Sequence, residues 1–434
     1  MRGSLKKWFL SILLVLALLV AAPSSVQAST SSADIDTAWD RAVSYSYEHP
    51  AELNTFWPWV YALALGSQGE ELVSSVVINP SVTSPTALAN SIIGVLGQRE
   101  DPTRVMVGDQ EVNLVTQLKD TQDVASGRFG SADATLNNTL WAVIALDMYN
   151  RHYPTTPVSY EVNQAISYIK SKQSLAADDP LNPYGSFNES GSNGDADSTA
   201  HALVALANHV AADDAVVQNA LAFLQTVQND QGRIDYISYY EGICYQSDSS
   251  ASTATVIEAL LALGLNPQSE AWTKNGNTLI DGMLAHQQPD GRIIDDAGGY
   301  SVDNTVFALG ALGDLHAGSS KYRGIFPLPS TSNRIISVTP AFSLSAGQDC
   351  DLTVKVRNGQ ATTQDTLVIA ALYNPVGQMV TYSYGQYNLG ANTTQTVGLG
   401  FAVTTAAGSQ VKVMAWDNWQ NKTPLCSPIT IPVQ

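Results

Sequence analysis

Two acidic residues at the start of a predicted helix are the strongest candidates for chemistry in this sequence. Asp195 and Asp197 precede a run of small and apolar residues, 202–206, whose composition favours a helix. A carboxyl group can act as a general acid when neighbouring acids and apolar surroundings keep it protonated. At the first turn of a helix, the same carboxylates can instead cap free backbone amides. Both roles, catalytic acid and helix cap, stay open for this pair.

Oxygen donors in the loop before this pair add a third interpretation. Asn188, Glu189 and Asn193 lie close to Asp195 in the sequence. Because Ca²⁺ prefers carboxylate and amide oxygens, a calcium site is an alternative for this loop. The six histidines show no zinc-binding spacing such as HExxH. Apart from the calcium alternative, we predict no metal site.

A tyrosine-rich loop between residues 235 and 250 is a second candidate site. Loops carried by a rigid scaffold often bind ligands, but tyrosines can also pack a loop onto its scaffold. Trp59 can likewise line a cavity or fill a core. The sequence contains no GxSxG motif, Walker loop or dinucleotide-binding fingerprint, and we predict no cofactor. The candidate ligand-binding residues are Tyr239, Tyr240, Glu241, Asp248, Asp303 and Trp59.

Four repeated units position these candidates. Each unit ends a helical stretch at a glutamine, continues through a glycine turn, and then enters a second helix rich in Ala and Leu. Two weaker units precede them, so six helix pairs are expected. Six pairs can close into a ring, an α6/α6 toroid, and we predict one over residues 33–320. The four glutamines, spaced by 51, 55 and 59 residues, are Gln122, Gln173, Gln228 and Gln287.

These repeats resemble the QW-type repeat of squalene cyclases and protein prenyltransferases, through residues 228–234 and 287–293. Residues 195–200 are similar to the D-x-D-D-T-A motif of class II terpene cyclases. The resemblance implies a cyclase-like ring and a proton-donor role for Asp197, with Asp195 as its neighbour. Ser198 stands where the motif has its third acid, which favours a protein that has lost cyclase chemistry.

The period of the apolar residues changes to two after a Pro- and Ser-rich connector, predicted at residues 321–333. Short alternating runs separated by turns predict an immunoglobulin-like β-sandwich over residues 334–434. This segment resembles the Ig-like modules of bacterial secreted and surface proteins. Cys350 and Cys426 both fall in it and are predicted to form a disulfide, which leaves Cys244 unpaired. Cys244 also invites comparison with complement-type thioester domains, but their glutamine follows one residue later than Gln246 does here.

The first 28 residues have the order of a signal peptide, with basic residues, an apolar stretch and a small residue at the end. No later apolar run is long enough to span a membrane, so we predict an extracellular protein, secreted or attached to the cell surface. The net charge is −18. Because an acidic surface repels phosphate groups, we predict no binding to nucleic acid.

Together these features predict an exported binding or structural module built on a helical toroid. Its ligand or surface partner cannot be named from the sequence. The alternatives are an enzyme, either a terpene cyclase relative using Asp197 or a carbohydrate-active toroid using paired carboxylates, and a carrier of corrinoid type, since cobalamin carriers also join such a ring to a β domain.

Overall fold

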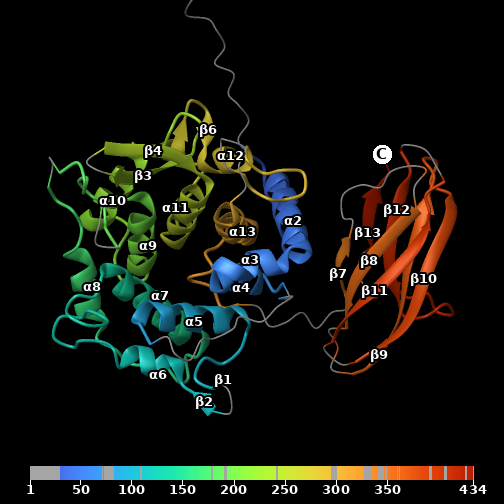
Figure 1. Ribbon diagram of the computed structural model, residues 1–434, viewed down its shortest axis with the longest axis horizontal. Coiled ribbons are helices and arrows are strands. Elements are labelled where there is room, and N and C mark those ends of the chain that lie inside the picture. The colour runs from blue at the N-terminus through green and yellow to red at the C-terminus, as the bar shows by residue number, and fades with distance from the viewer. Residues whose placement is uncertain are drawn as a thin grey trace, which may run out of the picture.

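The computed structural model describes two parts of the chain, a helical part followed by a part made of strands (Figure 1). The expected leader lies outside the described residues. The described residues are 30–70, 72, 83–107, 110–176, 179–189, 193–240, 243–294, 301–326, 334–339, 347, 349–358, 360, 362–390, 393–404, 408–425 and 428–433.

Six of the described helices form the inside of the helical part. Each contacts the next, and the last contacts the first, so the contacts form a closed cycle around a common centre (Figure 1). In the order of the cycle, they are α4 (Pro58–Ser67), α5 (Pro85–Gly97), α7 (Leu136–His152), α9 (Ala196–Leu206), α11 (Ser250–Ala262) and α13 (Val302–Ala317). Small residues permit the close approach. A Cβ on Gly66 of α4 would lie only 1.7 Å from the carbonyl oxygen of Gly97 in α5.

The remaining helices pack on the outside of this cycle. They are α2 (Ser32–Glu48), α3 (Pro50–Phe56), α6 (Leu114–Lys119), α8 (Val162–Lys170), α10 (Ala215–Thr226) and α12 (Leu279–Leu284), with the 3-10 turn η1 (Glu270–Trp272). Three short hairpins complete this part. Their strands are β1 (Val105–Val107), β2 (Gln110–Val112), β3 (Ile234–Tyr240), β4 (Ile243–Ser249), β5 (Thr273–Lys274) and β6 (Asn277–Thr278).

The repeated glutamines hold neighbouring units together. Each side-chain amide donates a hydrogen bond to a backbone carbonyl of the next outer segment, and the glutamine of the last repeat bonds to α2, the first outer helix. The outer layer is therefore linked end to end, as the inner helices are. The pairs are Gln122 Nε2 to Glu161 O at 3.1 Å, Gln173 Nε2 to Val216 O at 2.8 Å, Gln228 Nε2 to Trp272 O at 3.0 Å and Gln287 Nε2 to Ala38 O at 2.8 Å.

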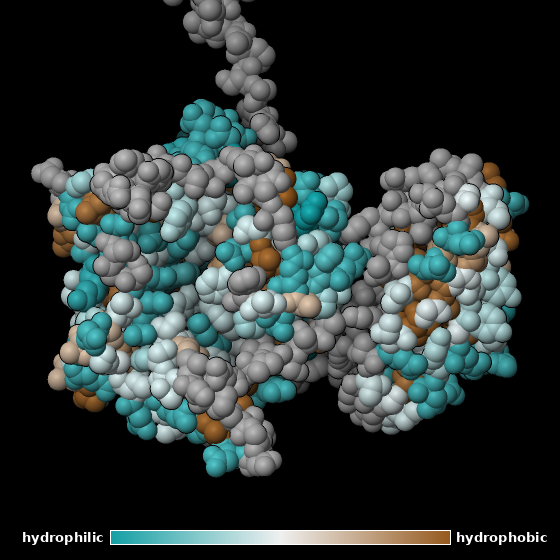
Figure 2. All heavy atoms as spheres, in the orientation of Figure 1, coloured by the Kyte–Doolittle hydropathy of each residue, from teal (hydrophilic) through white to brown (hydrophobic). Residues whose placement is uncertain are grey.

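The apolar side chains of the inner helices form one large buried cluster. On the face shown in Figure 2, hydrophobic residues appear on the helical part only as small separate areas. Tyr322 and Phe326 also belong to this cluster, with 6% and 7% of their surface exposed. Lys321, Tyr322 and Phe326, at the start of the predicted connector, therefore pack into the helical part, because the connector carries two aromatic side chains before its Pro and Ser residues.

The strand part consists of antiparallel sheets. One has the order β10-β9-β12-β13 and the other β11-β8-β7, with a shared apolar cluster. Cys350 is a buried thiol on β8, and burial raises its pKa to about 11. Cys426 lies outside the described residues, so the disulfide stays a prediction. The strands are β7 (Arg334–Thr339), β8 (Asp349–Arg357), β9 (Gln364–Tyr373), β10 (Met379–Leu389), β11 (Thr394–Ala402), β12 (Gln410–Trp416) and β13 (Ile429–Pro432).

Candidate functional site

The first turns of the inner helices meet at one end of the helical part, which we call the mouth. Side chains and amides from the starts of neighbouring helices bond to one another there, which requires the helices to be parallel. Since the positive ends of the helix dipoles gather at the mouth, negative charge is stabilised there. These bonds are Trp57 Nε1 to Asp303 Oδ1 at 2.6 Å, Thr86 Oγ1 to Asn138 Oδ1 at 2.5 Å and Ala251 N to Asn304 Oδ1 at 3.1 Å.

Asp195 is the N-terminal cap of α9. Its Oδ1 accepts a hydrogen bond from the Ser198 amide at 2.7 Å, and its Oδ2 accepts one from the Ser198 hydroxyl at 2.8 Å. Burial raises the pKa of Asp195 to about 6, and the neighbouring Asp197 adds to the rise. Both oxygens of the Asp195 carboxyl thus accept hydrogen bonds from Ser198 in the first turn of its own helix. Ser198 is the residue that stands where the cyclase motif has its third acid.

Asp197 lies in the first turn of α9 and has no such partner. Its Oδ1 is shielded from solvent and accepts no hydrogen bond from the described residues. Burial raises the pKa of Asp197, while the charge of His201 and the nearby Ser252 lower it. The Ser252 hydroxyl, on the neighbouring α11, is also buried and does not meet any described group at hydrogen-bond geometry. Asp197 Oδ1 and Ser252 Oγ therefore lie close together on adjacent helices, and neither makes a hydrogen bond of good geometry to the described residues.

His201, one helical turn after Asp197, carries a positive charge at neutral pH. Its Nδ1 lies 3.0 Å from Glu189 Oε2, and both side chains are largely buried. Burial lowers the pKa of His201, but the carboxylates of Glu189 and Asp197 outweigh burial and raise it to about 9. The mouth thus holds an imidazolium between two carboxyl groups.

Aromatic rings form an apolar belt beside these charges. The Trp141 ring lies 4.7 Å from His201 and 4.8 Å from the Trp59 ring, measured between centroids. Trp57 continues the belt to Phe307, at 5.4 Å. Trp59 and Trp141 are 6% and 5% exposed, so this part of the belt has little solvent-accessible surface.

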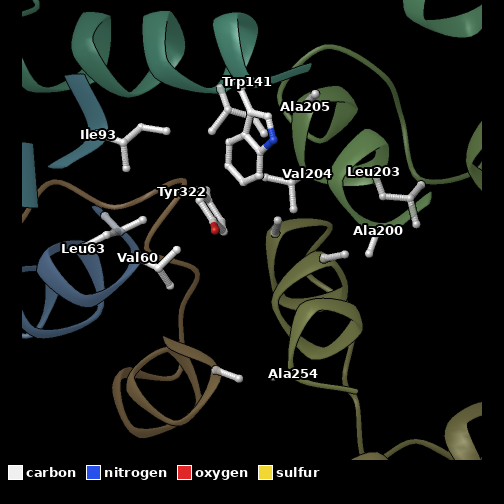
Figure 3. Close-up of a cluster of buried hydrophobic side chains, with 14 of the residues drawn as sticks. Val60, Leu63, Ile93, Trp141, Ala200, Leu203, Val204, Ala205, Ala254 and Tyr322 are labelled. Atoms are coloured by element: carbon white, nitrogen blue, oxygen red, sulfur yellow. The ribbon is translucent and has the colours of Figure 1, made fainter. Parts of the chain in front are cut away.

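The interior next to this belt is packed. Figure 3 shows Trp141 and Tyr322 near the centre of the buried cluster, with Val60, Leu63 and Val204 around them. Tyr322 reaches this position from the segment that follows α13. At this level, side chains fill the space between the inner helices.

The structure brings some of the predicted residues together at the mouth. Asp195 and Asp197 lie there, Asp303 bonds to Trp57, and Trp59 belongs to the aromatic belt. The hairpin β3–β4 contacts α9 and α11, but four predicted binding residues fall outside what the structure describes. They are Glu241 itself and the side chains of Tyr239, Tyr240 and Asp248.

Two residues of the site were missed as functional candidates, His201 and Glu189 in its role as the partner of His201. A signal for His201 was present, since a histidine four residues after Asp197 lies on the same helix face. Among the described residues, no group of three His, Cys, Asp or Glu side chains is arranged to hold a metal ion. No described helix is both long and apolar enough to cross a membrane.

Comparisons with known proteins assign no family. No family model matches the chain, and no curated protein matches it. Solved structures give weak likenesses. The ent-copalyl diphosphate synthase of Streptomyces platensis is 15% identical, with a TM-score of 0.34, over 60% of this chain and 50% of that chain. The C-terminal domain of Wzt is 14% identical, with a TM-score of 0.20, over 24% of this chain and 75% of that chain. At these TM-scores, the likenesses establish neither fold nor function.

Proposed function

We propose that this protein is an exported binding module. In this proposal the helical part is an α6/α6 toroid of the terpene cyclase type that takes a small ligand at its mouth. The strand part is an Ig-like sandwich that docks the protein. The closed cycle of inner helices and the two antiparallel sheets support this assignment.

The observation that carries the proposal is Asp197 Oδ1, a buried carboxyl oxygen that accepts no hydrogen bond of good geometry from the described residues. A buried polar atom without a hydrogen bond costs about 1–3 kcal/mol, so a native protein rarely keeps one without a use. A ligand with a hydroxyl or amide group would satisfy Asp197 Oδ1 and Ser252 Oγ together. Its apolar side would contact the aromatic belt. The ligand class is therefore a small molecule with one apolar face and one hydrogen-bonding edge.

Binding fits the mouth better than cyclisation does. A terpene cyclase needs a deep apolar cavity that encloses the folded isoprenoid chain. Buried side chains, including Trp141 and Tyr322, occupy the centre between the inner helices (Figure 3). Asp195, the neighbour of the proton donor in the cyclase motif, is engaged with Ser198. A shallow ligand held at the mouth needs neither the cavity nor a second free acid.

A fragment screen tests this function. We expect a library of small cyclic alcohols and amides, followed by ligand-observed NMR, to contain binders of the full chain. Asp197→Asn combined with Ser252→Ala should abolish their binding, whereas Asp213→Asn, at an exposed position, should not. Binders that are indifferent to the double variant, or no binders at all, would contradict the proposed site.

One observation favours catalysis as the second candidate. Burial raises the pKa of Asp197, which is the direction that a general acid requires. Incubation with geranylgeranyl diphosphate, followed by gas chromatography with mass detection, tests this role. A cyclised product that disappears in Asp197→Asn would replace the binding assignment with an enzymatic one.

The docking role of the strand part is supported by exposed aromatic rings on its β10-β9-β12-β13 sheet. Tyr382 and Tyr384 are 47% and 52% exposed, and Trp419 lies 5.2 Å from the Tyr384 ring. Residues 335–434 carry no net charge, with four acidic and four basic side chains. Uncharged surroundings and open rings suit a neutral polysaccharide. Cosedimentation with purified cell-wall glycan should fall when Tyr382 and Tyr384 are both changed to Ala, and unchanged cosedimentation would contradict this role.

A further inference from the structure

A lysine is completely buried at the end of the ring opposite the mouth. Lys321 follows α13, and its side chain has 0% exposed surface. Its Nζ lies 2.5 Å from Glu258 Oε1 on α11 and 3.4 Å from Asp314 Oδ2 in the last turn of α13. The two carboxyl groups are 4% and 0% exposed. An amine and two acids therefore share one site without water contact.

The charges of this cluster do not balance if all three groups are ionised, because two carboxylates face one ammonium. Burial raises the pKa of Asp314 to about 7, although Lys321 opposes the rise. Burial thus favours the neutral, protonated form of Asp314. A neutral carboxyl group is an electrophile at its carbon, whereas a carboxylate is not.

The surroundings orient Asp314 and Glu258 for different roles. Asp314 Oδ1 accepts a hydrogen bond from the Lys321 backbone amide at 2.8 Å, which polarises the carbonyl. Glu258 Oε1 is the oxygen nearest to the amine, and the Tyr322 hydroxyl donates to Glu258 Oε2 at 3.1 Å. Gly310 leaves room for this arrangement, since a Cβ there would lie 2.5 Å from Glu258 Oε1. Asp314 is placed as acceptor and Glu258 as base.

We propose that Lys321 and Asp314 condense to an intramolecular amide bond, an isopeptide cross-link, with Glu258 transferring the protons. Glu258 takes a proton from the Lys321 ammonium, and the free amine attacks the Asp314 carboxyl carbon. The new C–N bond forms while one C–O bond breaks. The nitrogen loses two protons in all: one passes through Glu258 to the departing hydroxyl, which leaves as water, and the other stays on Glu258, so no oxidant or cofactor is needed.

In water, an amine and a carboxylic acid do not condense readily, and the fold favours the reaction by holding the two groups in contact. Groups held in contact react as if present at effective concentrations of about 10⁵ M or more in favourable cases. The product also replaces a buried ammonium and a buried acid with a neutral amide, which removes a desolvation cost. The bond would join the end of α13 to the segment that carries Tyr322 into the interior (Figure 3). That segment would then be fixed to the ring by a covalent link.

Intact mass spectrometry of the denatured full chain tests the cross-link. We expect a mass lower than that of the sequence by one water molecule, and a fragment that joins the peptides containing residues 314 and 321. Lys321→Arg should restore the full mass, because a guanidinium does not condense with an acid. Glu258→Gln should slow or prevent the loss.

Two outcomes overturn the proposal. The full mass in the wild-type protein would show that the bond does not form, and this holds whether or not the variants fold. A water loss that hydroxylamine converts to a hydroxamate, or one that maps to another residue pair, would identify a succinimide or a different link. A loss that resists hydroxylamine and maps to residues 314 and 321 supports the proposal.

Discussion

Changing Glu189 to Gln removes the carboxylate that faces the buried ring of His201 at 3.0 Å. Burial alone lowers the pKa of His201, and Glu189 is the largest contribution that raises it to about 9. Without this charge, we expect the pKa of His201 to fall to its ordinary value of 6.5 or below. A fall of that size corresponds to about 3 kcal/mol between the two protonation states. His201 would then be mostly neutral above pH 7.5.

The same shift governs how stability depends on pH. Because the folded state raises the pKa of His201, this histidine stabilises the protein fully below pH 6.5, and the contribution is lost as the pH rises through about 9. Urea unfolding between pH 6 and 10 should show this loss in the wild-type protein, and a smaller loss in Glu189→Gln. Titration of the histidine Cε1 protons by NMR measures the pKa directly.

Glu52→Gln is a matched control, because Glu52 lies 3.6 Å from His49 in an exposed pair. This variant should leave the titration of His201 unchanged. A wild-type pKa near 6.5 for His201 would refute the claim that this histidine is charged at neutral pH. An equally raised pKa in Glu189→Gln would refute the claim that Glu189 raises it.

Three further predictions concern the ring itself. Tyr322→Ala should lower the free energy of unfolding by about 3–5 kcal/mol, because it leaves a cavity at a packed position. Tyr322→Phe should lower it by about 1 kcal/mol, because the hydrogen bond to Glu258 is lost. Urea unfolding measures both changes. Gln287→Ala should cost about 1–3 kcal/mol, because the carbonyl of Ala38 loses its partner, and a value near zero would mean that the link between the last repeat and α2 is unimportant. Gly66→Ala should lower the melting temperature by pushing α4 away from α5, and an unchanged melting temperature would contradict the close contact at Gly97.

The repeated units were the part of the structure that the sequence predicted in most detail. Gln122 and its three equivalents, each followed by a glycine turn, predicted helix pairs, and in the structure these glutamines bond one pair to the next. The repeat can be recognised from the sequence because the residues that define each unit lie close together in the chain. Of the predicted site residues, four lie at the mouth, and their catalytic and binding roles stay predictions: Asp195, Asp197, Asp303 and Trp59.

The buried lysine cluster could not be predicted in this way. Glu258, Asp314 and Lys321 come from three separate segments, and only tertiary packing brings them together. Lys321 also begins the segment that was predicted to be a connector from its Pro and Ser residues. For this reason the burial of Tyr322 was not predicted. His201 was missed for a different reason, because its charge depends on Glu189, twelve residues earlier in a loop.

The measurement that tests the central claim most directly is the location of a bound fragment. Intermolecular NOEs from a fragment identified in the screen should reach the indole protons of Trp59 and Trp141, and they should vanish in Asp197→Asn. That result would place the ligand at the mouth, between the aromatic belt and Asp197 Oδ1. NOEs that map only to other parts of the chain, and persist in Asp197→Asn, would contradict the account.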